Sequence, residues 1–310
     1  MFTPSYARLH EQGLLSDRAA TALEQLRECR LCPRACGVDR TRGGSGFCRT
    51  GRHAKAASFG AHFGEEAPLV GSHGSGTIFF SSCNLLCTFC QNSDISHGAE
   101  GVEVGPREIA GMMLDLAGRG CHNINFVTPS HVVPQILEAL VIAADAGLDL
   151  PLVYNTGGYD AVETLRLLEG VFDIYMPDFK FWDPEPAQAF CRAPDYRDAA
   201  CNAILEMHRQ VGDLVMDDRG IARSGLLVRH LVMPGGLAGT QDVMRFLAEQ
   251  VSRHTYVNVM DQYHPCHRAG KDPRIDRRIT AVEYEDALDA ARRAGIHRLD
   301  DRKRITVRML

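Results

Sequence analysis

From residue 77 onward, short apolar runs alternate with longer amphipathic segments. Apolar runs rich in Val, Ile, Phe and Tyr are typical of buried strands, and apolar residues three or four positions apart are typical of helices. The pattern predicts strands at 77–82, 123–128, 152–156, 172–177, 226–233 and 256–260. It predicts helices at 106–117, 132–146, 161–168, 199–211, 241–252 and 281–294. This alternation indicates an α/β fold built of βα units around a parallel sheet.

The number of predicted units limits the architecture. Six units are too few for the closed eight-stranded barrel, and barrel enzymes place their chemistry at the carboxyl ends of the strands. Polar residues that end the predicted strands are therefore the first candidates for a functional site.

The helix predicted at 281–294 begins with a capping box formed by Thr280 and Glu283.

The first 76 residues have weaker periodicity. A helix is predicted at 17–28, with Ser16 as its cap. Residues 49–76 are interpreted as a connector with at most one hairpin. We divide the chain into 1–70 (helix, cysteine-rich segment and connector), 71–270 (the βα units, as a partial barrel) and 271–310 (helical extension).

Composition and charge narrow the class of protein. The 310 residues carry a formal net charge of −5, with Lys and Arg spread along the chain, so no nucleic-acid partner is expected. No apolar run reaches the roughly 20 residues that a membrane span needs, so no membrane partner is expected either. Residues 1–8 lack the apolar core of a signal peptide. We therefore expect a cytoplasmic protein, in which the clustered members of its 11 cysteines are metal ligands or catalytic thiols.

Three cysteines follow the strand predicted at 77–82. Cys83, Cys87 and Cys90 are spaced C-x3-C-x2-C. Soft thiolates select zinc, copper(I) or iron–sulfur clusters, and a closed tetrahedral site normally needs four ligands. Three thiols can instead hold three irons of a cubane cluster and leave the fourth iron open. A zinc loop with a borrowed fourth ligand, or a set of buried structural thiols, is the alternative.

A second group of cysteines lies nearer the N-terminus. Cys29, Cys32, Cys36 and Cys48 are spaced C-x2-C-x3-C-x11-C, and the glycines between them allow tight turns. This pattern predicts a folded-back metal knuckle. A structural zinc site, a second iron–sulfur cluster and a set of reduced structural thiols all fit the spacing.

The aromatic residue before the third cysteine of the loop, Phe89, completes the pattern C-x3-C-x-φ-C. With this motif the chain resembles the radical S-adenosylmethionine (SAM) superfamily. The segment 32–38 and the strand ends resemble its PflX-like branch, which is related to the pyruvate formate-lyase activating enzymes. These strand ends lie at 125–131, 154–159, 173–180, 227–235 and 258–265. The resemblance covers residues 29–265 and implies an open (β/α)6 partial barrel preceded by the cysteine-rich knuckle.

The resemblance also implies roles for individual residues. Cys83, Cys87 and Cys90 would bind a [4Fe–4S] cluster whose open iron chelates SAM, and Phe89 would pack near the adenine. The superfamily's Gly-Gly-Glu-like turn after the second strand is replaced here by Thr128-Pro129-Ser130-His131.

That replacement makes Thr128 and His131 candidates for lining the SAM site. Asp178 and Lys180 match an Asp-x-Lys motif that faces the methionyl end of SAM, and His264 matches a ribose-contacting histidine. Asn155 precedes Gly157 and Gly158, which would let a ligand approach the backbone.

Three further residues are candidates for substrate contacts. Arg229 could bind a carboxylate through its planar guanidinium group. Alternation along a strand places Arg229 and His230 on opposite faces, so we expect one of the two to line the site. Cys266, two residues after His264, is a candidate hydrogen donor, although a spectator thiol is the simpler interpretation.

The function implied is an oxidoreductase that reductively cleaves SAM to a 5′-deoxyadenosyl radical and abstracts hydrogen from a substrate. A glycine of a protein is the first substrate hypothesis, by analogy with the activating enzymes, and a peptide or small molecule the second. A one-electron reductant such as flavodoxin or ferredoxin would be required. Two other classes remain: a zinc-dependent barrel hydrolase, and a non-catalytic iron–sulfur electron carrier.

Overall fold

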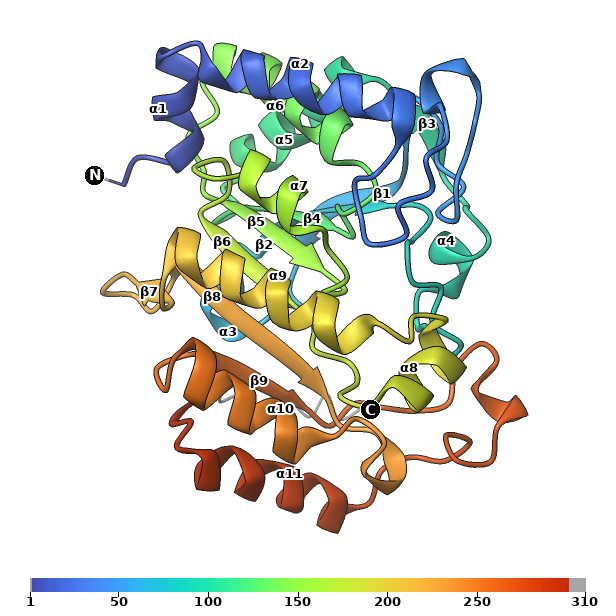
Figure 1. Cartoon of the computed structure of the whole chain (residues 1–310). Helices are drawn as coiled ribbons and strands as arrows, with labels where there is room; N and C mark the ends of the chain where they lie inside the picture. Colours follow the sequence, from blue (N-terminus) through green and yellow to red (C-terminus); the bar gives the residue numbers. More distant parts are fainter. Residues whose placement is uncertain (1, 301–310) are drawn as a thin grey trace, which may run out of the picture.

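The computed structural model describes residues 2–300. Its centre is a ten-stranded sheet with the order β10-β9-β8-β6-β5-β4-β2-β1-β3, and β7 pairs with β8 at one side (Figure 1). The strands are β1 (Ala54–His62), β2 (Ser75–Phe80), β3 (Val102–Val104), β4 (Ile124–Val127), β5 (Leu152–Thr156), β6 (Ile174–Pro177), β7 (Val215–Met216), β8 (Ala222–Leu231), β9 (Tyr256–Met260) and β10 (Arg298–Leu299).

The strands from β2 to β10 along this order are parallel, whereas β1 runs antiparallel to both β2 and β3. Among the residues described, β3 and β10 stand at opposite ends of the sheet and do not close it. The predicted open partial barrel is thereby confirmed, and all six predicted strands occur.

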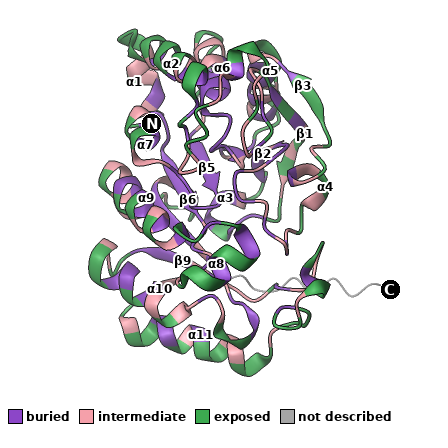
Figure 2. Ribbon diagram, turned by 45° about the vertical axis from the view of Figure 1, so that its right-hand side comes forward, coloured by how far each residue is buried: buried purple, intermediate pink, exposed green. Residues whose placement is uncertain are grey.

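Helices cover the outside of the sheet. They are α1 (Ser5–Glu11), α2 (Leu14–Glu24), α3 (Ala67–Val70), α4 (Ser93–Ser96), α5 (Pro106–Gly118), α6 (Val133–Asp145), α7 (Val162–Leu167), α8 (Pro184–Cys191), α9 (Tyr196–Val211), α10 (Thr240–Phe246) and α11 (Ala281–Ala294). The central strands are buried, and the outer faces of the helices are exposed (Figure 2). Within residues 2–300, no helix combines the length and apolar character that a bilayer span requires.

The N-terminal region differs most from the expectation. The predicted helix 17–28 is α2, which begins after Gly13 in a left-handed conformation (φ 75°) rather than at a Ser16 cap, and which tightens into a 3-10 turn at Gln25–Glu28. The predicted connector contains the nine-residue strand β1, which pairs antiparallel with β2, as in the hairpin allowed there, and also with β3. Alanine and glycine have low strand propensity, so the partners rather than the sequence of β1 determine its conformation.

Besides the four-residue helices α3 and α4, the sequence pattern missed α1 and α8. In α1, Tyr6 is buried and its hydroxyl donates to the Leu148 carbonyl oxygen at 2.9 Å. α8 follows β6 and ends at the buried residue Cys191. Both helices are short, and a single buried side or end leaves little periodicity to detect.

Candidate active site

A cavity of about 440 Å³ lies at the carboxyl ends of the parallel strands. Its lining comes from the loop after β2 and from the ends of β4, β5, β6, β8 and β9. Gln91, Asn92 and Gln262 are exposed side chains of the lining, so the cavity opens to the surface. This is the edge of the sheet where parallel α/β folds place their ligands.

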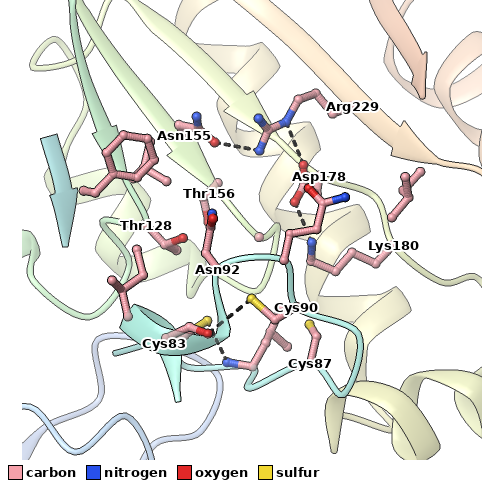
Figure 3. Close-up of a pocket in the computed structure, with 18 of the residues that line it drawn as sticks. Cys83, Cys87, Cys90, Asn92, Thr128, Asn155, Thr156, Asp178, Lys180 and Arg229 are labelled. Carbon is pink, nitrogen blue, oxygen red and sulfur yellow. Dashed lines mark hydrogen bonds and ion pairs between the residues drawn. The ribbon is translucent and has the colours of Figure 1, made fainter. Parts of the chain in front are cut away.

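The loop after β2 brings Cys83, Cys87 and Cys90 to this cavity. The loop turns sharply, with left-handed backbone at Ser82 (φ 75°) and Leu86 (φ 54°). Hydrogen bonds fix it from both sides: the Thr88 N–H donates to the Phe190 carbonyl, and the Arg268 N–H donates to the Thr88 carbonyl. The three thiols therefore stand together at one side of the cavity (Figure 3).

The pKa values of these three thiols are raised above the ordinary value of a cysteine. Burial raises the pKa of Cys83 to about 12, and it also raises the pKa of Cys90. The pKa of Cys87 is raised well above the ordinary value, first by its contact with the Cys191 thiol and then by burial. Binding of a metal by these thiols would have to release their protons, because only thiolates coordinate metals.

Charged side chains occupy the opposite side of the cavity (Figure 3). Asp178 accepts from Lys180 Nζ at 2.5 Å through Oδ2 and from Arg229 Nε at 2.7 Å through Oδ1. Arg229 Nη2 also donates to Asn155 Oδ1 at 2.7 Å, and Arg229 Nη1 lies 3.9 Å from Glu65 Oε2. β5, β6, β8 and the loop after β1 thus contribute to one network.

The network stabilises the ionised forms of its side chains. Burial alone would raise the pKa of Asp178, but Arg229 and Lys180 outweigh it and lower that pKa. Burial would lower the pKa values of Lys180 and Arg229, but Asp178 raises both, with help from Glu65 and Glu66 at Arg229. The site therefore presents a carboxylate and two cations at neutral pH.

The remaining residues expected in the SAM site divide into two groups. Phe89 and Thr128 line the cavity, and the Phe89 ring packs edge-on against Phe181 and Tyr263. His131 and His264 are not among the lining residues. His131 is buried, and its Nε2 lies 2.9 Å from the Ser81 carbonyl, whereas His264 Nδ1 lies 3.2 Å from the Gln262 carbonyl.

Of the three residues expected to contact the substrate, one lines the cavity and two do not. Arg229 lines the cavity, but Asp178 and Asn155 already occupy its guanidinium group. His230 points to the other face, as alternation required, and is buried between the Phe179 carbonyl and the Thr240 hydroxyl. Cys266 is half-buried and is not part of the cavity lining.

Sequence reasoning missed three residues around this cavity. Glu65 lines it, and Glu66 beside it accepts from Asn258 Nδ2 at 2.8 Å. Burial raises the pKa of Glu66. Both glutamates lie in the stretch interpreted as a connector. The only feature of the sequence that could have pointed to them is that two acidic residues stand side by side there. Cys191 had no signal, because isolated cysteines are usually small buried hydrophobes.

The four N-terminal cysteines surround a second, smaller cavity of about 10 Å³. The segment folds back on itself: the Cys29 N–H donates to the Val38 carbonyl, and the Gly37 N–H donates to the Cys29 carbonyl. Gly46 is needed here, since a Cβ at this position would lie 2.7 Å from Cys36 Sγ. Arg34 ties the segment to the loop after β2, because its Nε donates to the Asn84 carbonyl at 2.9 Å.

The donor geometry bears on which metal group each site could hold. Within residues 2–300, no three His, Cys, Asp or Glu side chains are set around a single metal ion. At the larger cavity, three thiols at one side and open space before them fit a cubane cluster with one iron left for a ligand, as the donor chemistry implies. A zinc ion would require these thiols and a fourth donor to converge on one point.

The fold of the chain is similar to that of proteins whose structures have been solved. The structure resembles that of a radical SAM methyltransferase from Sphaerobacter thermophilus, with a TM-score of 0.50 and 16% identity over 71% of this chain and 64% of that one. A second solved structure, the radical S-adenosylmethionine methyltransferase TsrM from Kitasatospora setae with tryptophan and a SAM analogue, has a TM-score of 0.47 and 12% identity over 72% and 53%. The chain spans less than two thirds of either protein. At 16% identity, the likeness to the Sphaerobacter thermophilus protein shows the fold alone.

A closer relative is found by sequence. The chain is 32% identical over 297 residues to MJ0674 of Methanocaldococcus jannaschii, which is described as an uncharacterized protein. The match covers 93% of this chain and 81% of that protein, so the chain belongs to the same family as MJ0674. No profile of a known protein family matches the chain.

Proposed function

We propose that the protein is a radical SAM enzyme that binds a [4Fe–4S] cluster through Cys83, Cys87 and Cys90. The observation that carries the proposal is that three thiols of the cavity lining face an ion network across a cavity of about 440 Å³. When bound, the cluster and SAM supply reductive cleavage of the sulfonium and a 5′-deoxyadenosyl radical that abstracts hydrogen from the substrate.

The chain's own residues would bind and orient SAM. The methionyl group of SAM carries an ammonium and a carboxylate. In the proposal, the Asp178 carboxylate attracts the ammonium and Lys180 attracts the carboxylate as a point charge. Arg229 and Asn155 hold Asp178 in place from the other side.

Phe89 would supply an apolar wall for the adenine. Its ring is already fixed by Phe181 and Tyr263, so it loses little freedom when a ligand arrives. Thr128 adds a hydroxyl on the wall formed by β4.

The substrate and the electron donor belong to the proposal as well. A glycine of a protein is the first substrate hypothesis, in keeping with the PflX-like motifs, and the exposed residues at the cavity mouth leave a path for a peptide or a small molecule. A flavodoxin or ferredoxin is proposed as the one-electron reductant, because a small acidic redox protein can supply single electrons to a cluster.

Anaerobic cluster analysis tests the proposal. The Cys83→Ala variant should lose the cluster of this loop and its ability to bind SAM in equilibrium dialysis. The Cys201→Ala variant changes a half-buried thiol on α9, away from the cavity lining, and should behave as the wild type. Unchanged iron, sulfide and SAM binding in Cys83→Ala would refute the ligand assignment.

A further inference from the structure

The loop after β2 lies between the active-site cavity and a hollow of about 360 Å³ at the surface, which we call the outer hollow. Cys87 and Phe89 belong to the lining of the active-site cavity. Leu86 and Thr88, which alternate with them along the chain, belong to the lining of the outer hollow. A molecule seated in the outer hollow would therefore contact both chain neighbours of Cys87.

The outer hollow is positively charged. Its lining includes three exposed arginines, Arg49, Arg192 and Arg268, and no Asp or Glu among the residues described. None of the three arginines forms an ion pair within residues 2–300. The whole chain carries a net charge of −5, so this group of cations departs from its overall charge. Such a patch attracts an acidic surface and raises the rate of encounter with it.

Two of these arginines lie on segments that contact the cysteine loop directly. The Arg268 N–H donates to the Thr88 carbonyl at 2.9 Å. Arg192 follows Cys191, whose Sγ lies 3.1 Å from Cys87 Sγ. These contacts use the backbone of Arg268 and the neighbour of Arg192, so both guanidinium groups remain available to a partner at the surface.

The position of the outer hollow indicates what kind of partner it would bind. A cluster held by this loop has to receive single electrons from outside the chain. Electron-transfer complexes are small and short-lived, with less than about 1,200 Å² buried, and charge attraction sets their rate of formation more than wide apolar contact does. An acidic carrier seated against Leu86 and Thr88 would have its carboxylates at the arginines and its redox group beside the cysteine loop.

We propose that the outer hollow is the docking surface for a small acidic protein that carries single electrons. The inference rests on the cluster proposed above for the loop after β2. The reduced carrier gives one electron to that cluster and leaves in its oxidised form, and no bond is formed or broken. Arg49, Arg192 and Arg268 attract and position the carrier, and they take no part in the chemistry of SAM.

Charge reversal tests the docking surface. The double variant Arg192→Glu/Arg268→Glu places two carboxylates at the outer hollow and keeps the backbone contacts of the cysteine loop. Its matched control, Arg107→Glu/Arg253→Glu, makes the same change of net charge at two exposed residues outside the lining. The probes are a reduced flavodoxin and a reduced ferredoxin, both acidic. Stopped-flow absorbance measures how fast each carrier reduces the reconstituted protein at low ionic strength, and biolayer interferometry measures its affinity for the cluster-free protein.

With at least one carrier, the wild type and the control should be reduced at similar rates, and Arg192→Glu/Arg268→Glu at least about tenfold more slowly. The affinities should follow the same order. Added salt should slow the reduction of the wild type and narrow the difference, because it screens exposed charges. Equal rates and affinities in the three proteins, or reduction of the wild type that does not respond to salt, would overturn the docking surface.

Dithionite separates this proposal from the proposed function, because a small reductant needs no docking surface. With dithionite, Arg192→Glu/Arg268→Glu should form 5′-deoxyadenosine from SAM at nearly the wild-type rate. An equal loss with dithionite and with the carrier would assign the defect to the cysteine loop and would overturn the docking surface. A wild type that does not cleave SAM with dithionite, but keeps the difference between the variants with a carrier, would refute the proposed function and support the docking surface.

Discussion

The Sγ atoms of Cys87 and Cys191 lie 3.1 Å apart, although 104 residues separate the two cysteines in the chain. Cys191 ends α8 and is fully buried, and the contact reaches across to the loop that follows β2. A thiol proposed to bind the cluster thus has a second thiol as its neighbour.

This contact predicts a specific oxidation product. Treating cluster-free protein with the thiol oxidant diamide should join Cys87 to Cys191, as the two thiols give two electrons and two protons to diamide. Peptide mapping by mass spectrometry should recover the linked peptides, and reconstitution of the Cys83 site should fall accordingly. Cys191→Ala should remain reconstitutable at this site. A map that lacks the Cys87–Cys191 pair would contradict the prediction.

Arg229→Gln removes one of the two cations that hold Asp178. Breaking a mostly buried ion pair on one side leaves an uncompensated carboxylate, so the free energy of unfolding should fall by about 3 kcal/mol. SAM binding should weaken as well, because Asp178 loses its fixed position. Urea denaturation and equilibrium dialysis measure the two effects. Arg274→Gln, at an exposed ion pair, should change neither the free energy of unfolding nor SAM binding. An equal loss of stability and SAM binding in both variants would contradict a specific role of the Arg229–Asp178 pair.

Gly158→Ala tests how tightly the end of β5 packs against Asp178. A Cβ on Gly158 would lie 2.1 Å from the Asp178 carbonyl oxygen, and the backbone there has φ 79°. We expect a loss of at least about 2 kcal/mol in the free energy of unfolding, together with weaker SAM binding. Gly111→Ala in α5 meets no atom within 4 Å and should be neutral or slightly stabilising. A Gly158→Ala variant as stable as the wild type would show that the strand end can shift.

His230 predicts a dependence of stability on pH. Burial lowers its pKa to about 4, and its Nδ1 and Nε2 are already held by Phe179 and Thr240. The unfolded chain binds a proton near pH 6.5 and the folded chain only near pH 4, so stability is lost as pH falls between these values, by up to about 3 kcal/mol.

Urea denaturation at several pH values measures this effect. His230→Gln should be less stable than the wild type at pH 7.5 because it loses these contacts, but its stability should change less between pH 6.5 and pH 4. Parallel curves for wild type and His230→Gln would contradict the assignment.

The sequence was sufficient for the parts of the molecule that depend on local pattern. All six buried strands were predicted, because continuous apolar runs do not depend on their neighbours for recognition. Alternation along β8 correctly separated Arg229 from His230. The three thiols were found because their spacing lies within eight residues.

What could not be predicted depends on contacts between distant segments. β1 is an Ala- and Gly-containing strand that forms through pairing with β2 and β3. Glu65 reaches the cavity from the loop that follows β1, and His131 was expected beside SAM but lies between Ser81 and the four-cysteine cavity. In each case the sequence shows the residue type, but only the fold shows its neighbours.

The most direct test of the central claim is the fate of SAM when the reconstituted protein is reduced with dithionite without oxygen. The account predicts that the wild type and Cys201→Ala form 5′-deoxyadenosine and that Cys83→Ala does not, as measured by liquid chromatography and mass spectrometry. Intact SAM with a fully loaded and reduced wild type, or equal product from Cys83→Ala, would contradict the account.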